Sequence, residues 1–299
     1  MKNFKDKVAV ITGAGSGMGR ELALQFAAKG AKVAINDWNH DTLNETLAMV
    51  KEQGGEGIAR RFDVSDKEAI YNFAKEVISY FGHVDIVINN AGFTLPARSL
   101  EHSEYEDFEK LIGVNMWGVI YGTKAFLPHL KTRPEAVVMN TSSVFGIFAY
   151  PTQGPYCTAK FAVRGFTETL RLELETEGVD NVQVCCIHPG GIKTGIVTNI
   201  DHSKSELTKA EIAEGAKNFN DMAPTTAADA AGQIIRAIER KNPKLLIGRD
   251  AKFMDFIARL FPTKYGKILL KGLKNNKETL AKAFQPKAKK KVVDVVEKV

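Results

Sequence analysis

A tyrosine and a lysine near the middle of the sequence have the types and spacing of an acid/base pair. Tyr156 and Lys160 stand at positions i and i+4, which places both on one face of a helix. A phenol with a pKa of about 10 is a poor base at neutral pH, and a lysine cation beside it favours the phenolate. Ser143 lies 13 residues before the tyrosine, at the end of a predicted strand. These side chains predict a site that exchanges a proton with a substrate oxygen.

A glycine-rich segment follows the first predicted strand. Residues 12–19 have the pattern T-G-x-x-x-G-x-G, with an apolar strand before them and a helical pattern after them. Glycine permits a tight turn and a close approach of the backbone to a pyrophosphate, and the N-terminus of the next helix faces the anion. The segment therefore predicts a dinucleotide-binding loop, with a strand–helix turn that binds nothing as the alternative.

Asp37 indicates which dinucleotide this loop would hold. It closes the second predicted strand, 18 residues after Gly19. A carboxylate there can accept hydrogen bonds from the adenosine ribose hydroxyls and would repel a 2′-phosphate. Neither Trp38 nor Ser16 offers a cation to such a phosphate, so NAD is favoured over NADP. The alternative role for Asp37 is a helix cap. The cations that could still accommodate a 2′-phosphate are Arg20, Arg60 and Arg61.

Strands and helices alternate along the body of the chain and must position these residues. Buried strands are predicted at 8–12, 32–36, 86–89, 136–140, 182–187 and 245–247, with a weaker one near 58–64. Helical patterns lie at about 18–29, 42–53, 67–81, 105–130, 154–177 and 227–240. Such alternation predicts an α/β fold, namely a single doubly wound parallel sheet of Rossmann type in three α/β/α layers, followed by a helical C-terminal extension.

The body and the C-terminus differ in charge. No linker or repeat divides residues 1–250, which we expect to form one dinucleotide-binding and catalytic domain, with a substrate lid at about 194–225. Residues 251–299 are predicted to be a basic, amphipathic, helical tail. Residues 252–299 hold 13 Lys and Arg against 4 Asp and Glu, whereas residues 1–251 hold 28 against 31. Nucleic-acid binding is not expected, because the body carries no basic face.

The tail has an apolar stripe among lysines. The stripe begins with Phe253, Phe256, Ile257, Leu260 and Phe261. Such a stripe most often packs against the body of the protein or against a second protomer, which is the favoured interpretation. Contact with an anionic membrane surface is the alternative.

Composition argues against a membrane-spanning, secreted or metal-binding protein. No apolar run is long enough to span a membrane, and the N-terminus does not resemble a secretory signal. Among three cysteines, Cys185 and Cys186 are adjacent in a predicted strand and are interpreted as core residues. His188 is interpreted as a structural hydrogen-bonding group. No His, Cys and carboxylate cluster has metal-ligand spacing, so no metal is expected, and a cytoplasmic location is predicted.

Taken in order, the motifs resemble those of the short-chain dehydrogenase/reductase family. The matching motifs are the loop at 12–19, Asp63-Val64, Asn89-Asn90-Ala91-Gly92, Asn115, Ser143, Tyr156 with Lys160, and Pro189-Gly190 with Thr194. Together they span residues 7 to about 250. Two features depart from the pattern: Met18 stands where isoleucine or leucine is usual, and the tail extends beyond the family core.

The resemblance implies a role for each catalytic residue. Tyr156 would give or take the proton on the substrate oxygen, and Ser143 would hydrogen-bond that oxygen. Lys160 would bind the nicotinamide ribose and lower the pKa of the tyrosine. Asn115 would hold a water that relays protons. The family usually assembles as homodimers or homotetramers, and we expect the same here.

The resemblance also implies the contacts with NAD. Asp63 and Val64 would lie at the adenine, and the segment after Pro189 would lie at the nicotinamide. The residues expected to bind NAD are Gly13, Ser16, Gly17, Met18, Gly19, Asp37, Asp63, Val64, Asn90, Ala91, Gly92, Tyr156, Lys160, Pro189, Gly190, Ile192 and Thr194.

The substrate pocket is expected to be apolar. Loops after the fourth, fifth and sixth strands carry Phe93, Leu95, Phe145, Tyr150 and Ile196, together with Ile147, Phe148 and Met222. Such a lining favours a hydrophobic secondary alcohol or ketone, and hence an NAD-dependent alcohol dehydrogenase or ketone reductase. The alternatives are an acyl-thioester ketoreductase that uses NADPH and a nucleotide-binding sensor without turnover.

Overall fold

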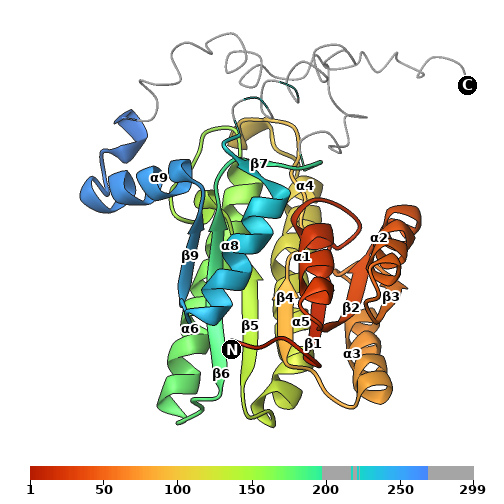
Figure 1. The fold of residues 1–299 in the computed structure, drawn as a ribbon. Coiled ribbons are helices and arrows are strands. Elements are labelled where there is room, and N and C mark those ends of the chain that lie inside the picture. The colour runs from red at the N-terminus through yellow and green to blue at the C-terminus, as the bar shows by residue number, and fades with distance from the viewer. Residues whose placement is uncertain (197–216, 218–220, 222, 269–299) are drawn as a thin grey trace, which may run out of the picture.

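The structure is a computed structural model that describes residues 1–196, 217, 221 and 223–268 (Figure 1). Within these residues, seven parallel strands form one sheet in the order β3-β2-β1-β4-β5-β6-β9. The strands are β1 Val8–Thr12, β2 Lys32–Asp37, β3 Gly57–Arg61, β4 Ile86–Asn89, β5 Ala136–Thr141, β6 Val182–Pro189 and β9 Lys244–Ile247. The strand order reverses between β1 and β4, as a doubly wound sheet requires. The predicted α/β fold is confirmed.

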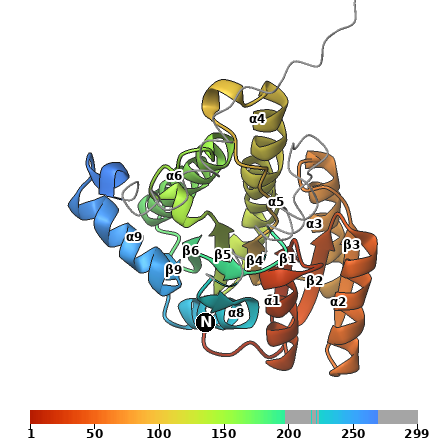
Figure 2. The same cartoon turned by 90° about the horizontal axis from the view of Figure 1, so that it is seen from above.

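Helices cover both faces of this sheet (Figure 2). On one face, α1 (Gly17–Ala28), α2 (His40–Glu52) and α8 (Ala227–Glu239) share a hydrophobic core with the sheet. On the other, α3 (Lys67–Phe81), α5 (Gly118–Lys131) and α6 (Gly154–Thr176) share a second core. Strands β1, β4 and β5 are buried along their whole length, which explains why their sequences read as continuous apolar runs.

Two elements differ from the sequence-based expectations. The helix expected at 105–130 consists of α4 (Tyr105–Ile112), a π-helical turn (Gly113–Trp117) and α5. The third strand stops at Arg61, because the Asp63 carboxylate accepts a hydrogen bond from the Ser65 N–H and starts a turn.

At the ends of the predicted lid, β7 (Ile192–Lys193) pairs with β8 (Thr225–Thr226). Most of the lid lies outside the described residues.

A buried carboxylate joins the amino ends of the central strands. Asp85, just before β4, is fully buried and accepts a hydrogen bond from Val8 N at 3.0 Å. Its carboxylate also lies 2.9 Å from Arg133 Nε and 3.2 Å from His83 Nε2. A buried charge of this kind is stable only while its partners remain in place.

Replacing this carboxylate should destabilise the fold. Asp85→Ala leaves the Arg133 guanidinium and the Val8 N–H without their acceptor, so we expect the free energy of unfolding to fall by about 3 kcal/mol. Urea denaturation at neutral pH measures this change. Asp180→Ala, at an exposed acid, is the control and should change it by less than about 0.5 kcal/mol. Equal effects of the two substitutions would contradict the structural role.

Candidate active site

The glycine loop after β1 is pressed against the segment that follows β4. The Thr12 hydroxyl oxygen accepts hydrogen bonds from the N–H groups of Asn90 at 3.0 Å and Ala91 at 3.1 Å. The Asn90 side chain donates to the carbonyls of Thr12 and Gly13. Gly13 has φ +66°, and a Cβ there would lie 2.7 Å from Ala91 Cα, so only glycine fits.

Helix α1 begins directly at this loop with an uncapped N-terminus. A Cβ at Gly19 would overlap the Gly13 carbonyl, so the helix can approach the loop only with glycine there. The N-cap residue Ser16 makes no side-chain capping hydrogen bond, and the first turn holds no acidic residue. The free N–H groups and the positive end of the helix dipole therefore suit an anionic ligand.

Asp37 at the end of β2 is tied to the same loop. Its carboxylate accepts hydrogen bonds from Gly15 N at 2.8 Å and Asn39 N at 2.9 Å. Asn39 is the residue that caps α2, so Asp37 does not act as the helix cap. The carboxylate is instead fixed beside the glycine loop.

Each of the three arginines near Asp37 has hydrogen-bond or ion-pair partners of its own. Arg20 donates to the Gly15 carbonyl at 2.6 Å and lies 3.0 Å from Glu45. Arg60 forms an ion pair with Glu76. Arg61 Nε donates to the Trp38 carbonyl.

The start of α6 brings Tyr156 and Lys160 together. Lys160 is 2% exposed, its Nζ lies 5.6 Å from the centre of the Tyr156 ring, and it donates to the Thr141 carbonyl at 2.9 Å. Burial lowers the pKa of Lys160 to about 8, because water no longer stabilises the cation. Burial raises the pKa of Tyr156 to about 12, an effect that a hydrogen bond with Ser143 partly offsets. The isolated protein thus holds a protonated phenol beside a lysine that titrates near neutrality.

Ser143 is held from the neighbouring strand β6. The Nδ1–H of His188 donates to the Ser143 carbonyl at 3.0 Å, and the Ser143 hydroxyl oxygen accepts from Phe145 N at 3.1 Å. His188 is fully buried, and burial lowers its pKa to about 4, so the ring is neutral. This confirms the prediction that His188 is a structural hydrogen-bonding group.

Asn115 occupies the π-helical turn and faces the same centre. Its side chain accepts from Phe93 N at 3.0 Å and donates to the Phe93 carbonyl at 2.8 Å. A Cβ on Gly92 would lie 3.0 Å from Asn115 Oδ1 and 3.3 Å from Lys160 Nζ, which shows how closely the three residues converge. The irregular turn thus places Asn115 beside Lys160.

The segment after β6 returns to the glycine loop. Thr194 lies so near Gly17 that a Cβ on the glycine would be 3.2 Å from the threonine side chain. The Asp250 carboxylate accepts from Gly191 N at 2.6 Å and thereby fixes the turn after Pro189. Sequence reasoning missed Asp250; the available signal was an acid just beyond the end of β9, at the carboxyl edge of the sheet.

Other predicted cofactor residues lie around this edge. Ser16 is exposed, and Met18 is partly buried against the core of α1. Asp63 is also exposed, whereas the buried Val64 packs against Gly118. Ile192 is buried in β7, and Gly190 N donates to the Ile247 carbonyl.

Aromatic residues stand beside Tyr156. Phe145 stacks on Tyr150 with ring centres 4.9 Å apart and meets Tyr156 edge-on at 6.2 Å. Phe148 was expected at the pocket but is fully buried, because it packs in a small core with Val144 and Ala251. Phe93, Leu95, Ile147 and Ile196 are partly buried, and Met222 lies outside the described residues.

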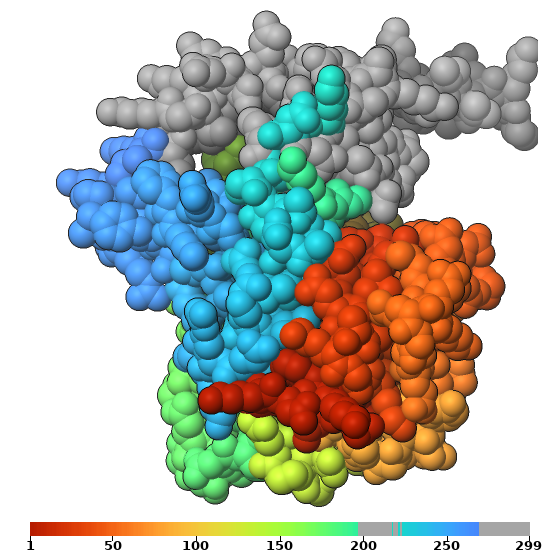
Figure 3. Space-filling model, in the orientation of Figure 1, coloured from red at the N-terminus to blue at the C-terminus, as the bar shows by residue number. Residues whose placement is uncertain are grey.

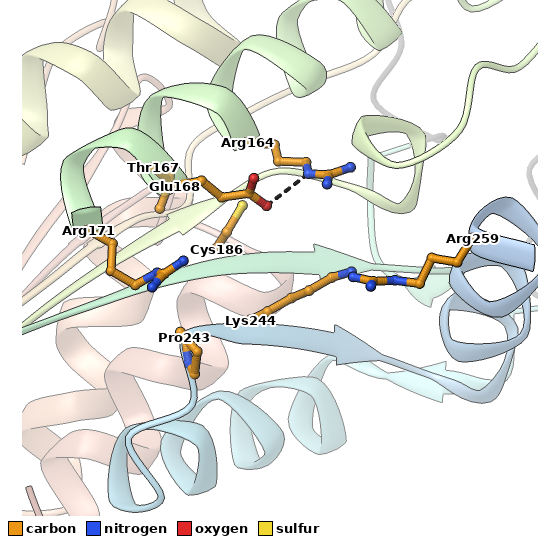
Figure 4. A pocket seen from close by; sticks show the side chains of 8 residues that line it. All are labelled: Arg164, Thr167, Glu168, Arg171, Cys186, Pro243, Lys244 and Arg259. Carbon is orange, nitrogen blue, oxygen red and sulfur yellow. Dashed lines mark hydrogen bonds and ion pairs between the residues drawn. The ribbon is translucent and has the colours of Figure 1, made fainter. Parts of the chain in front are cut away.

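Basic residues line a separate hollow of about 300 Å³ beside α6 and β9 (Figure 4). Arg164 points to Glu168 at 2.9 Å, and Lys244 and Arg259 both bind Asp255. Each of these cations has a carboxylate partner, so the hollow is an ion-pair cluster apart from the Tyr156 centre.

Across the parts of the chain that the structure describes, no three His, Cys, Asp or Glu side chains are grouped so that they could hold a metal ion. Within the same residues, no helix combines the length and the apolar character needed to cross a membrane.

Comparisons with known proteins agree with this arrangement. The short chain dehydrogenase family model matches residues 7–205. SadH of Mycobacterium tuberculosis, named as an oxidoreductase, is 39% identical over 275 residues, which cover 91% of this chain and 97% of SadH. A short chain dehydrogenase/reductase from Burkholderia phymatum in complex with NAD has a TM-score of 0.78 at 29% identity and covers 91% of this chain and 97% of its own. An alcohol dehydrogenase from Thermococcus sibiricus complexed with 5-hydroxy-NADP has a TM-score of 0.66 at 28% identity, with coverages of 81% and 96%. The chain belongs to the short-chain dehydrogenase/reductase family of oxidoreductases.

Proposed function

We propose that this oxidoreductase transfers a hydride between NAD and a hydrophobic secondary alcohol or ketone. The observation that carries the proposal is the convergence of Ser143, Tyr156 and Lys160 beside the glycine loop, at the edge of the sheet where ligands bind in such folds. Small-molecule turnover and assembly into a homodimer or homotetramer are expected of a family member.

The residues at this edge fit a nicotinamide dinucleotide. The uncapped α1 and the glycine loop (Gly13, Ser16, Gly17, Met18 and Gly19) suit a pyrophosphate. Adenosine would lie along Asp37, Asp63, Val64, Asn90, Ala91 and Gly92. The nicotinamide end would lie along Pro189, Gly190, Ile192 and Thr194. When bound, the nicotinamide supplies the carbon that accepts or gives the hydride.

Tyr156 supplies the proton in this scheme. In the reductive direction its protonated phenol donates to the carbonyl oxygen, and Lys160 stabilises the phenolate that remains. Ser143 donates a hydrogen bond to the same oxygen as charge develops on it. In the oxidative direction the phenolate accepts the hydroxyl proton. Asn115 is proposed to hold the relay water next to Lys160.

The surroundings of Asp37 support NAD as the cofactor, and the aromatic residues beside Tyr156 support a hydrophobic substrate. The Asp37 carboxylate is fixed beside the loop, where it can accept from the ribose hydroxyls, while Arg20 and Arg60 pair with carboxylates. Both features favour NAD over NADP.

The stacked Phe145 and Tyr150 give the substrate side an apolar wall, together with Phe93, Leu95 and Ile196. Such a wall suits a hydrophobic substrate.

Removing the tyrosine hydroxyl should abolish turnover but not cofactor binding. With NAD and a panel of cyclic and long-chain secondary alcohols, Tyr156→Phe should lower kcat/KM by at least about 100-fold, measured as NADH absorbance. Calorimetry should show that NAD still binds, with a loss of affinity far smaller than the loss of kcat/KM. Tyr80→Phe, at a tyrosine that is 59% exposed on α3, is the control. A wild-type protein that binds NAD but turns over no alcohol or ketone would favour the sensor alternative.

Asp37 should decide the choice between NAD and NADP. Asp37→Ala removes an ionised acceptor for the ribose hydroxyls, so the Kd for NAD should rise at least about tenfold while NADP binds more tightly than to the wild type. Titration calorimetry with both cofactors measures the ratio. Asp41→Ala alters an acid whose side chain is 92% exposed on α2 and should leave the ratio unchanged. An unchanged ratio in Asp37→Ala would contradict the assignment.

The charge on Lys160 should appear in the pH dependence of ketone reduction. Because its pKa in the protein is about 8, the cation is present below this pH and is lost as the pH rises through it. kcat/KM should therefore fall above pH about 8. Lys160→Met should be slower below that pH and should show no transition there. A wild-type profile that stays flat through pH about 8 would show that the lysine charge does not assist proton transfer.

A further inference from the structure

Helix α9 (Arg249–Leu260) carries an apolar face that points away from the protein. Phe253, Phe256 and Leu260 are 60%, 59% and 56% exposed and share one face of the helix. The opposite face, with Ala251 and Met254, packs against the small core around Phe148. The favoured expectation was that this stripe packs on the body of the protein or on a second protomer. These three side chains do not pack on the body of the same chain, and packing on a second protomer stays a prediction.

Ion pairs and core contacts fix this orientation. Asp255 lies on the inner side of α9 and binds Lys244 of β9 at 2.6 Å and Arg259 at 3.0 Å. Beyond the helix, the Tyr265 hydroxyl oxygen accepts a hydrogen bond from Ala149 N at 3.1 Å. Rolling the helix inward to bury the stripe would break the Asp255–Lys244 pair, whose lysine reaches across the hollow in Figure 4.

The stripe lies at the outer edge of the molecule. Figures 1 and 2 both place α9 outside β9, at the side of the sheet, and Figure 3 shows it as a shoulder at the side of the body. The apolar surface continues through Phe261 and Ile268, which are 38% and 39% exposed. An apolar patch of this kind on a folded chain marks a contact with another surface.

The charges around the stripe identify that surface. The acids of residues 249–268 point inward: Asp250 binds Gly191 N, and Asp255 is 9% exposed. The cations of this segment are exposed, and the basic sequence continues to the C-terminus, with 13 Lys and Arg against 4 Asp and Glu in residues 252–299. These cations are Arg249, Lys252, Lys264 and Lys267, together with Arg259, which is also exposed but pairs with Asp255.

This pattern favours an anionic lipid surface over a second copy of the chain. Cations that flank an exposed aromatic stripe match lipid headgroups above an apolar layer. A two-fold contact through the same face would bring the same cations of both copies together, and interface cores are depleted in lysine.

We propose that the outward face of α9 docks on anionic bilayers. Phe253, Phe256 and Leu260 enter the interfacial layer, and the flanking cations contact the headgroups. The helix lies along the surface and holds the carboxyl edge of the sheet close to the lipid.

Vesicle co-sedimentation of the full chain tests this. Vesicles of phosphatidylcholine with about 30% phosphatidylserine should bind the protein at least about tenfold more strongly than pure phosphatidylcholine, and added salt should weaken the binding. Phe253→Ser/Phe256→Ser/Leu260→Ser should lower binding at least about tenfold. The control, Tyr80→Ser/Tyr105→Ser/Leu172→Ser, changes three large exposed side chains on α3, α4 and α6, which are 59%, 86% and 54% exposed, and should bind as the wild type does.

Three results would overturn the proposal. One is a full chain that does not sediment with the anionic vesicles. Another is an α9 variant that binds them as strongly as the wild type. The third is an α9 variant whose molar mass by light scattering falls to that of a smaller assembly, because the stripe would then be a contact between copies. Loss of binding at unchanged molar mass supports docking.

Discussion

The buried ammonium of Lys160 is the constraint on which the rest of the site depends. Removing a cation from water is costly unless other groups stabilise it, and the structure supplies the Thr141 carbonyl at 2.9 Å and the nearby Tyr156 ring. This lysine–carbonyl hydrogen bond joins the end of β5 to the start of α6. A second bond joins the same two elements, because the Ser142 hydroxyl donates to the Lys160 carbonyl at 2.7 Å. The same burial raises the pKa of Tyr156 to about 12 and lowers that of Lys160 to about 8, so it sets the protonation of both members of the proposed proton-transfer pair.

The carboxyl edge of the sheet gathers the other parts around this corner. Thr12 ties the end of β1 to the segment after β4, and His188 ties β6 to Ser143 after β5. Thr194 then brings the segment after β6 back to Gly17. Because these links cross between strands, they fix the glycine loop, the Tyr156–Lys160 pair and the turn after Pro189 relative to one another.

Much of this could be predicted from sequence, because the signals are local. Continuous apolar runs gave the strands, glycine spacing gave the loop, and the i, i+4 spacing paired Tyr156 with Lys160. The π-helical turn at Asn115 and the role of Asp250 were not predicted, since they depend on contacts between distant segments; Asp250 and Gly191 are 59 residues apart. The sequence also left open which surface the α9 stripe would face, because the Asp255–Lys244 pair, formed between separate elements, sets the face that is buried. The substrate lid and the cytoplasmic location stay predictions.

The central claim is that the site formed by Ser143, Tyr156 and Lys160 supports hydride transfer between nicotinamide and a substrate carbon. The most direct test is reduction of a hydrophobic ketone by the wild-type enzyme with NADH deuterated at C4, in separate runs for the two faces of the ring, with mass spectrometry of the alcohol. The account predicts that one deuterium appears on the carbinol carbon with one of the two labelled cofactors and none with the other. Alcohol formed without deuterium from either cofactor, or no alcohol from any ketone despite bound NADH, would contradict it.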